Sequence, residues 1–374
     1  MAIVRFGDVV RRANTKVDKD NTELEFYVGG EHFDSGELLV TKRGLIKGST
    51  IGPMFYFGFK AGQVLIVSRN PHLRKASMVK FDGICSEKTF VVESKDENLL
   101  LKDYLPFIVQ SDGFWRFAEE NKSGSVNFFI NWTTFARYEF NLPDLEEQKK
   151  LVDLIWAANK TKEAYKKLLS LTDELIQAKF IDMFGDPVTN PLGWKTSTIK
   201  TVAPETQYKG ELNSDVWLLN LDMIEPNTGI VINKVMMPIE EIGGSVCTFD
   251  KNYVLYSKLR PYLNKVVLPD DKGVATSELI PLKPNTNLLN RVFLACLLRT
   301  NQFVDYATNL SGGSRMPRVP MKDFRNFPCI LPPIELQDQF VEFVNQADRS
   351  KSELKQTISS IGNVIKSLMQ QYVG

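Results

Sequence analysis

The chain contains one segment twice, and this repetition constrains the fold more than any other feature. "LPDLEEQKKLVDL" begins at Leu142 and "LPPIELQDQFVEF" begins at Leu331, 189 positions later. Between 142–185 and 331–374 there are eleven identities and no gap. Because solenoid repeats run to only about 20–50 residues, a period this long predicts a duplicated domain.

The duplication extends upstream of these segments. "VLIVSRNPHLRKA" (64–76) matches "VLYSKLRPYLNKV" (254–266) at an offset of 190, and Ser86-Glu87 recurs as Ser277-Glu278. Further matches place Phe135 on Phe324, Ser125 on Ser314 and Gly185 on Gly374. The sequence therefore predicts two tandem halves, roughly 1–185 and 190–374.

The first part of each half has the mixed composition of an α+β domain. The sequence predicts strands in "EFYVG", "ELLVT", "QVLIVS" and "KTFVVE", and again in "VWLLN", "GIVIN" and "YVLYS", because these β-branched and aromatic runs are broken by Gly, Pro and Asn. Helical stretches are expected near 100–121 and 288–309. At 374 residues the chain can form two or three domains with cores of their own.

The second part of each half is predicted to be one long helix, beginning after Pro143 or Pro332. A 4-3 apolar alternation is typical of a coiled coil. It runs through Phe340, Val344, Ala347, Lys351, Leu354, Ile358, Ile361, Ile365, Leu368 and Tyr372, and through the matching positions of the first copy. The alternative is an amphipathic helix lying on its own domain. Lys162 and Lys351 occupy one matched position of this stripe, where a lysine either fixes the register or extends out of the seam.

The charge and cysteine content limit the partners and the compartment. The net charge is +1, so any nucleic-acid contact must come from local basic patches. No apolar run approaches the ~18 residues of a membrane span, and "MAIVRFGDVV" has no signal-peptide core. The four cysteines (Cys85, Cys247, Cys296, Cys329) show no CxxC spacing, which favours a cytoplasmic protein with neither disulfides nor a zinc site.

No reaction centre is recognisable in the sequence. His32 and His72 have no histidine counterpart in the second half, "GLIKGST" (44–50) lacks the spacing and lysine of a phosphate loop, and "PDLEEQK" (143–149) places its acids in the first turns of one helix. No Asn-Pro-Pro-aromatic or Asp-Pro-Pro-aromatic tetrapeptide is present. The sequence predicts a chain that binds rather than catalyses.

The order of these parts resembles the specificity subunits of type I restriction-modification systems. "SGGSRMPRVPMKDFRNFPCILPPIELQDQFVEFV" and "VLYSKLRPYLNKV" carry the resemblance, which covers the whole chain. It implies an α+β fold with a pseudo-two-fold internal repeat and two long conserved helices that form an antiparallel coiled coil. The implied domains are a first target-recognition domain (1–141), a central conserved helix (142–185), a linker (186–193), a second target-recognition domain (194–330) and a C-terminal conserved helix (331–374).

The resemblance also implies partners and a division of labour. Each recognition domain would read one half of a split target in double-stranded DNA, while the paired helices hold the domains apart and dock two methyltransferase (M) subunits. Restriction (R) subunits would join that core. No cofactor is expected in this chain, because S-adenosylmethionine, ATP and Mg would lie on the partner subunits.

Residues of the recurring loops are candidates for contacts with the DNA backbone. They are Arg69, Arg74 and Lys75 in "SRNPHLRK" and Lys258, Arg260 and Lys265 in "SKLRPYLNK". Arg315 and Arg318 lie beside Gly312 and Gly313 in a further loop. The first half has only Lys122 and Asn127 there, so these arginines are expected to serve the second half-site alone.

Residues that differ between the halves are candidates for reading bases, because Arg and Lys favour guanine edges. These are Lys42, Arg43 and Lys47 in the first domain and Gln207, Tyr208, Lys209, Asn233 and Lys234 in the second. Two other function classes remain open at this point. One is a scaffold that binds only protein through its coiled coil, and the other is a self-contained DNA-modifying enzyme.

Overall fold

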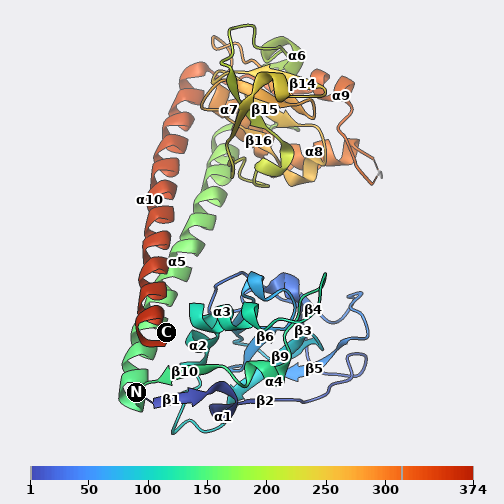
Figure 1. The fold of residues 1–374 in the computed structure, drawn as a ribbon. Coiled ribbons are helices and arrows are strands. Elements are labelled where there is room, and N and C mark those ends of the chain that lie inside the picture. The colour runs from blue at the N-terminus through green and yellow to red at the C-terminus, as the bar shows by residue number, and fades with distance from the viewer. Residues whose placement is uncertain (1, 313–314, 374) are drawn as a thin grey trace. The chain divides into compact units, whose positions relative to one another are not determined.

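A computed structural model of the chain describes residues 2–312 and 315–373 and confirms a mixed α+β fold. The chain forms two compact units (Figure 1). Unit 1 is Met1–Lys167 with Leu354–Gly374, and unit 2 is Leu168–Glu353. Gly313, Ser314 and Gly374, which belong to the repeat or to the candidate loop, lie outside the described residues.

Unit 1 contains three sheets with the strand orders β4-β3-β8-β5, β2-β9-β6-β7 and β1-β10. The pair β3/β8 is parallel, and the other pairs are antiparallel. Its elements are β1 (Ala2–Arg5), α1 (Phe6–Val9), β2 (Val10–Arg12), β3 (Phe26–Val28), η1 (Gly30–His32), β4 (Gly44–Leu45), β5 (Phe55–Phe59), β6 (Val64–Val67), η2 (Pro71–Leu73), β7 (Ala76–Met78), β8 (Gly83–Ser86), β9 (Thr89–Ser94), α2 (Leu105–Gln110), α3 (Asp112–Glu120), α4 (Trp132–Phe135), β10 (Glu139–Leu142), the beginning of α5 (Leu145–Phe184) and the end of α10 (Ile334–Val373).

Unit 2 has the orders β13-β12-β17-β14, β16-β15-β18 and β11-β19, which repeat this topology except that its described strands include no counterpart of β2. Its one parallel pair, β12/β17, corresponds to β3/β8. Besides the remaining parts of α5 and α10, it contains β11 (Thr196–Thr198), α6 (Ile199–Val202), β12 (Asp215–Leu219), η3 (Leu221–Met223), β13 (Val235–Pro238), η4 (Ile239–Glu241), β14 (Val246–Phe249), β15 (Val254–Ser257), η5 (Pro261–Leu263), β16 (Val266–Val267), β17 (Gly273–Thr276), β18 (Leu279–Leu282), α7 (Arg291–Arg299), α8 (Asn301–Leu310), α9 (Met321–Asn326) and β19 (Pro328–Ile330).

Two of the predicted strands are wrong. "ELLVT" makes only the isolated bridge Leu39↔Met78, and "GIVIN" makes only Ile224↔Val231. Leu38 and Val40 are buried, so the apolar run reflects burial rather than a sheet ladder. Gly229, at φ 67°, begins the second segment in a conformation that a strand does not use.

Each predicted helical stretch consists of two helices, α2 and α3 in unit 1 and α7 and α8 in unit 2. At matched positions between the two helices, Ser111 and Thr300 use their hydroxyl groups to cap the second helix. Ser111 Oγ accepts a hydrogen bond from Phe114 N (3.2 Å), and Thr300 Oγ1 accepts one from Phe303 N (3.3 Å). Such N-caps satisfy backbone donors that a new helix leaves open, so the chain turns there and starts α3 or α8.

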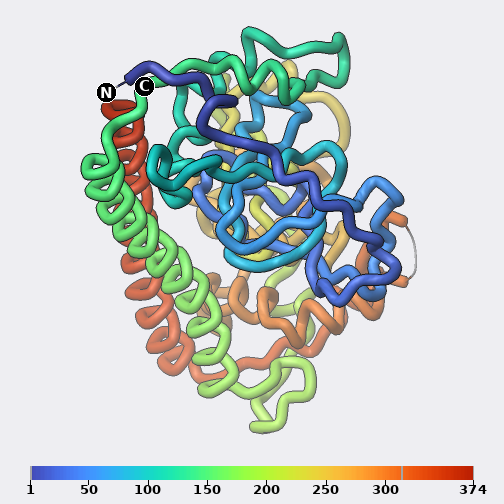
Figure 2. The backbone as a smooth tube through the Cα atoms, turned by 90° about the horizontal axis from the view of Figure 1, so that it is seen from below, coloured from blue at the N-terminus to red at the C-terminus, as the bar shows by residue number. Residues whose placement is uncertain are grey.

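The core of each unit includes both long helices. In unit 1 Leu151 and Ile155, near the start of α5, share a buried cluster with Ile365, Met369 and Val373, near the end of α10. The same elements lie beside one another in unit 1 in both views (Figures 1 and 2). The N-terminal turns of one helix therefore pack against the C-terminal turns of the other.

Unit 2 makes the reciprocal contact at matched positions. Phe180 and Phe184, near the end of α5, share a buried cluster with Phe340 and Val344 of α10. The ring centroids of Phe180 and Phe340 are 5.5 Å apart at 83°, and Phe293 of α7 lies 5.3 Å from Phe180. The first contact is edge-to-face and the second is stacked, and aromatic pairs of either kind add about 0.5–1.5 kcal/mol each to the burial of the rings.

A repeated glutamine fixes the start of each long helix. Gln148 is fully buried: its Oε1 accepts from Leu101 N (2.9 Å), and its Nε2 donates to the carbonyls of Leu99 and Pro143 (2.9 Å each). Gln337 makes the same three bonds in unit 2, to Asn290 N (2.8 Å) and to the carbonyls of Leu288 (3.0 Å) and Pro332 (2.8 Å).

No helix within residues 2–312 and 315–373 combines the length and the hydropathy needed to cross a membrane.

Candidate nucleic-acid interface

Each unit places two loops side by side at the end of its central strands. In unit 1 the loop after β6 lies against 122–130, with Asn70 N donating to Phe128 O (2.9 Å) and a bridge between Arg69 and Phe129. In unit 2 the loop after β15 lies against 315–320, with Arg260 N donating to Pro317 O (2.8 Å) and a bridge between Leu259 and Arg318. We call each arrangement the paired loops of its unit.

The backbone of these loops is held in an unusual conformation at matched positions. Asn70 and Arg74 have φ of 51° and 48°, and Arg260 and Asn264 have φ of 49° and 48°. The left-handed region costs an ordinary L-residue about 1–2 kcal/mol. The first position is occupied by Asn in one unit and by Arg in the other, and among the described residues the buried Nε of Arg260 has no hydrogen-bond partner.

The matched lysines of the paired loops donate hydrogen bonds to backbone carbonyls of their own units. Lys75 Nζ donates to Gly30 O (2.6 Å), and Lys265 Nζ donates to Leu221 O (2.7 Å), each at the first residue of a 3₁₀ helix. Burial lowers the pKa of Lys265. Lys258 Nζ likewise donates to Ser277 O (2.7 Å). Whether these lysines also reach phosphates stays a prediction.

The two arginines of the first unit's loop have different roles in the fold. Arg69 Nη1 donates to Asn127 O (3.2 Å), and its guanidinium lies 5.3 Å from the ring of Phe129. Arg74 pairs with Asp112 at 2.5 Å, where α3 begins. Burial alone would raise the pKa of Asp112, but hydrogen bonds from Arg74 and Gln370 lower it. Arg74 therefore forms a structural ion pair with Asp112 in unit 1. The same carboxylate accepts a hydrogen bond from Gln370, near the end of α10.

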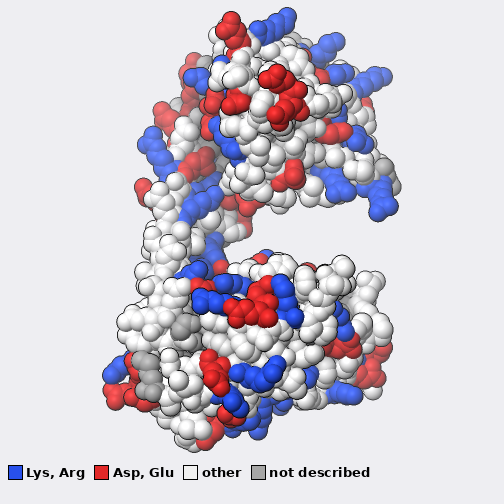
Figure 3. Space-filling model, in the orientation of Figure 1, with Lys and Arg blue, Asp and Glu red and all other residues white. Residues whose placement is uncertain are grey.

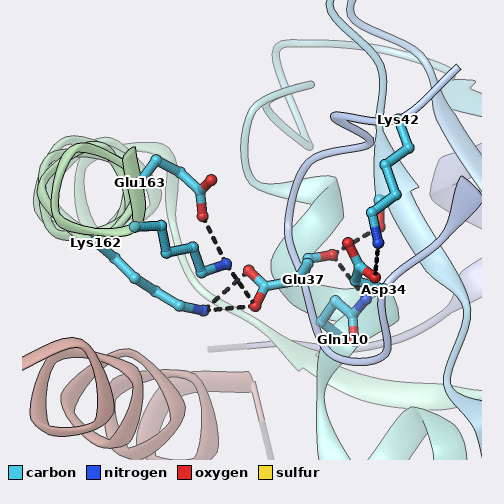
Figure 4. A network of polar contacts seen from close by, with 8 residues as sticks. Asp34, Glu37, Lys42, Gln110, Lys162 and Glu163 are labelled. Carbon is cyan, nitrogen blue, oxygen red and sulfur yellow. Dashed lines mark hydrogen bonds and ion pairs between the residues drawn. The ribbon is translucent and has the colours of Figure 1, made fainter. Parts of the chain in front are cut away.

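The candidates for base reading in unit 1 lie around β4. Lys42 pairs with Asp34 at 2.6 Å (Figure 4), and the guanidinium of Arg43 lies over Phe26 at 3.8 Å and near Phe81 at 4.7 Å. Lys47 is exposed. The guanidinium of Arg43 therefore already contacts aromatic rings of its own unit, whereas Lys47 is exposed to solvent.

The candidates of unit 2 do not form one group. Gln207, Tyr208 and Lys209 lie against β14, where Gln207 Oε1 accepts from Thr248 N (2.6 Å). Asn233 and Lys234 precede β13, at the opposite edge of the same sheet. Lys234 pairs with Asp270 (3.0 Å) and lies 4.4 Å from the ring of Trp217, whereas Lys209 and Asn233 are exposed. By contrast, the paired loops bring Lys258, Arg260 and Arg318 together.

A repeated carboxylate at the paired loops was not recognised as functional from the sequence. Glu278 accepts a bidentate hydrogen bond from Arg318, and its counterpart Glu87 accepts from Tyr56 Oη (3.0 Å) and Lys88 Nζ (2.5 Å). The hydrogen bond from Lys88 is the largest of the influences that lower the pKa of Glu87. The recurrence of Ser-Glu in both halves was the signal that could have indicated this position.

The cysteines of the chain lie inside the two units. All four cysteines are buried, which raises the pKa of Cys85 and Cys329 to about 12 and of Cys247 and Cys296 to about 11, far from the thiolates that attack substrates. His32 Nδ1 accepts a hydrogen bond from Gly29 N (2.9 Å). Within the part of the chain that the structure describes, no three His, Cys, Asp or Glu residues are placed to hold a metal ion.

The chain consists of two similar α+β units, and the paired loops of each unit contain basic residues. Residues 244–361, which extend from β14 into α10, match the family model described as the type I restriction modification DNA specificity domain. The resemblance predicted from the sequence is thus confirmed.

The chain is also similar to one curated relative. The type I restriction enzyme EcoDI specificity subunit of Escherichia coli is 29% identical over 127 residues. The alignment covers 32% of this chain and 28% of that relative, so it spans less than a third of the relative's length.

Two solved structures share the fold. One is the type I restriction-modification S subunit from M. genitalium, with a TM-score of 0.55 and 11% identity, covering 100% of this chain and 96% of that one. The other comes from work on complex assembly and conformational transition of the type I R-M system, with a TM-score of 0.55 and 17% identity, covering 99% of this chain and 97% of that one.

Proposed function

We propose that the chain is the DNA specificity subunit of a type I restriction-modification complex and that each unit reads one half of a split target. The observation that carries the proposal is the repetition of the matched domain. Residues 244–361 match the DNA specificity domain, and unit 1 repeats the strand orders, apart from its additional strand β2, and the paired loops of unit 2. Two similar readers on one chain suit a target with two parts, and their different loop residues suit halves of different sequence.

The long helices are the second part of the proposal. Each has 40 residues, or about 60 Å at 1.5 Å per residue, and within each unit the start of one packs against the end of the other. We infer an antiparallel pair that sets the spacing of the half-sites and docks two methyltransferase subunits, with restriction subunits joining the complex. In this proposal the partners carry S-adenosylmethionine, ATP and Mg, and this chain makes and breaks no covalent bond.

Exchanging one recognition domain tests the central claim. Residues 1–141 are replaced by the corresponding domain of a related subunit, and the methylated motif is read from the DNA of cells that also contain the methyltransferase subunits. One half of the motif should change and the other should stay. A change in both halves or in neither contradicts the assignment of one half-site to each unit.

Insertions in α5 test the spacing role. Four residues added near Phe180 lengthen a helix by about 6 Å, close to one full turn, so the faces of the helix are nearly kept. Since DNA rises about 3.4 Å per base pair, the unread spacer should grow by about one or two base pairs while both half-sites stay the same. Two added residues turn the following chain by about 200° and should abolish activity. An active four-residue variant with its spacer unchanged would remove the spacing role.

The two other function classes have their own outcomes. A scaffold that binds only protein would give a complex without sequence-selective, salt-dependent DNA binding. A self-contained DNA-modifying enzyme would methylate or cleave DNA without partners, so the purified chain is assayed alone with S-adenosylmethionine, Mg, ATP and DNA. Activity of the chain alone would overturn the proposal.

A further inference from the structure

Arg318 in the paired loops of unit 2 is held by a carboxylate in a defined orientation. Its Nε lies 3.2 and 3.1 Å from the two carboxylate oxygens of Glu278, and its Nη2 lies 2.9 Å from Oε1. The Arg318 side chain is 48% exposed and that of Glu278 is 23% exposed. An exposed ion pair of this kind stabilises the fold by at most about 1 kcal/mol, so its geometry is more informative than its strength.

Among the residues that the structure describes, Glu278 alone binds the guanidinium, which leaves one of its edges free for a second bidentate partner. The group is planar and carries five N–H donors. Glu278 occupies the edge formed by Nε and one N–H of Nη2, so the terminal edge, formed by Nη1 and the other N–H of Nη2, points away from the carboxylate. A terminal guanidinium edge matches the O6 and N7 acceptors of guanine, the commonest specific contact in the major groove.

The setting of the pair favours DNA over another ligand. Lys258 N donates to Glu278 O (3.0 Å), and Val319 N donates to Lys258 O (2.9 Å), so the carboxylate, the lysine and the Arg318 segment form one connected structure. Arg260 joins it through Pro317. Figure 3 shows Lys and Arg side chains along one edge of unit 2. Such a basic cluster is attracted to DNA phosphates, and the fixed orientation of Arg318 adds a donor group that can point toward a base edge.

Unit 1 has the same carboxylate but a different residue opposite it. Phe129 occupies the position of Arg318, since Phe129 bridges Arg69 as Arg318 bridges Leu259. Glu87, the counterpart of Glu278, is bound by Tyr56 and Lys88 instead. A phenyl ring offers no donor to a base edge.

We propose that Glu278 is a positioning residue that aims Arg318 at a guanine of the half-site read by unit 2, and that unit 1 makes no such contact at the equivalent position. This inference rests on the proposed function. It predicts that the two half-sites differ at the base pair that these equivalent loop positions face.

The test uses the full chain assembled with its methyltransferase subunits and a random double-stranded DNA library, from which bound molecules are sequenced. The wild-type complex should select a split motif with a guanine in one half. Arg318→Ala should relax that position about 5- to 150-fold and leave the other positions unchanged, as loss of one bidentate contact does. Arg318→Lys keeps the charge but not the fork, so it should relax the same position while preserving overall affinity.

Glu278→Gln separates positioning from folding. It frees Arg318 from its fixed orientation and removes a negative charge from the loops. Preference for the guanine should therefore fall, while affinity for DNA of any sequence rises, a combination that a destabilised fold would not give.

Arg325 supplies the matched control. It pairs with Glu205 through Nε (3.2 Å) and Nη2 (2.7 Å) in the same unit, and its side chain is 45% exposed, but it lies on α9 outside the paired loops. Arg325→Ala should leave every base preference unchanged.

Each result decides the matter. If Arg318→Ala weakens binding to all sequences equally, Arg318 is a phosphate contact and the inference is wrong. If the wild-type complex selects a split motif that Arg318→Ala leaves intact, the inference is wrong and the proposed function stands. If the wild-type complex selects no motif, the proposed function itself fails.

Discussion

The repeated lysine of the long helices has a different partner in each unit. In unit 1 Lys162 of α5 pairs with Glu37 at 2.9 Å (Figure 4), and Lys166 pairs with the same carboxylate at 2.9 Å. In unit 2 Lys351 of α10 pairs with Asp173 of α5 at 2.8 Å and with Asp348 of its own helix at 2.9 Å. Both lysine side chains are only 14–16% exposed.

The same repeated position therefore makes a different contact in each unit. A largely buried ammonium requires a carboxylate, and the location of that carboxylate decides which elements are tied together. In unit 1 the lysine ties α5 to the segment that also contains Asp34, the partner of Lys42, and Gln110 Nε2 donates to Glu37 O (3.1 Å). In unit 2 the lysine ties one long helix to the other. Of the two roles predicted for the lysine, the contact between helices in unit 2 suits the fixing of register.

The largest expected effect concerns a feature that the units share. Gln337→Leu removes three hydrogen bonds and leaves buried backbone groups unpaired, so we expect unit 2 to lose about 3 kcal/mol of stability. Gln148→Leu should cost unit 1 the same within about 1 kcal/mol. Hydrogen exchange in urea, which follows each unit separately, measures both. Unequal losses would show that the repeated glutamine does not have the same structural role in both units.

The lysines should give smaller and unequal effects. We expect Lys162→Met to destabilise unit 1 by about 2 kcal/mol and Lys351→Met to destabilise unit 2 by about 1 kcal/mol, because Glu37 is 21% exposed whereas Asp173 and Asp348 are 45% and 57% exposed. Hydrogen exchange again separates the units. The reverse order would mean that the helix-to-helix contact is the stronger one.

The same pairs should respond to opposite extremes of pH. Burial alone would raise the pKa of Glu37, but Lys162 and Lys166 lower it below the ordinary 4.5, so its contribution is present above pH 4.5 and is lost as the pH falls through the folded pKa. Burial alone would lower the pKa of Lys351, but Asp173 and Asp348 raise it above 10.5, so its contribution is present below pH 10.5 and is lost as the pH rises through the folded pKa.

Urea midpoints across the pH range measure this response. Lys162→Met should weaken the acid loss and leave the contribution of Lys351 at alkaline pH intact. An unchanged acid limb would show that the pairing of Glu37 does not contribute to stability.

The smallest effect concerns a position where the units differ. Lys258→Ala should weaken binding to all DNA sequences several-fold and lower the salt slope by about 1, as loss of one phosphate contact does. The matched residue of unit 1 is Ser68, whose Oγ donates to Lys88 O (2.8 Å), so Ser68→Ala is the control and should not alter the slope. Binding curves at several salt concentrations give both slopes. Altered base preference in Lys258→Ala would instead make Lys258 a base-reading residue.

The candidate interface was only partly accessible from the sequence. The recurrence of 64–76 at 254–266 pointed to loops that the structure places at equivalent positions in the two units. It did not show that Lys75 and Lys265 donate to backbone carbonyls, or that Arg318 is held by Glu278, because those partners lie 40 or more positions away in the chain. The sequence also did not show that the base-reading candidates beside β13 and those beside β14 lie at opposite edges of one sheet, because strand order depends on contacts between distant segments.

The sequence by itself determined the duplication, the mixed α+β composition and the resemblance to type I specificity subunits, because these reside in local patterns and in their spacing. It also contained the stripes whose residues the structure places in shared buried clusters. Only the tertiary structure decided which carboxylate each repeated lysine meets, that "ELLVT" packs without forming a strand, and how the guanidinium of Arg318 is oriented. The physical reason is that charge pairing and burial depend on which distant segments the fold brings together, and a side chain's own neighbours in sequence do not specify them.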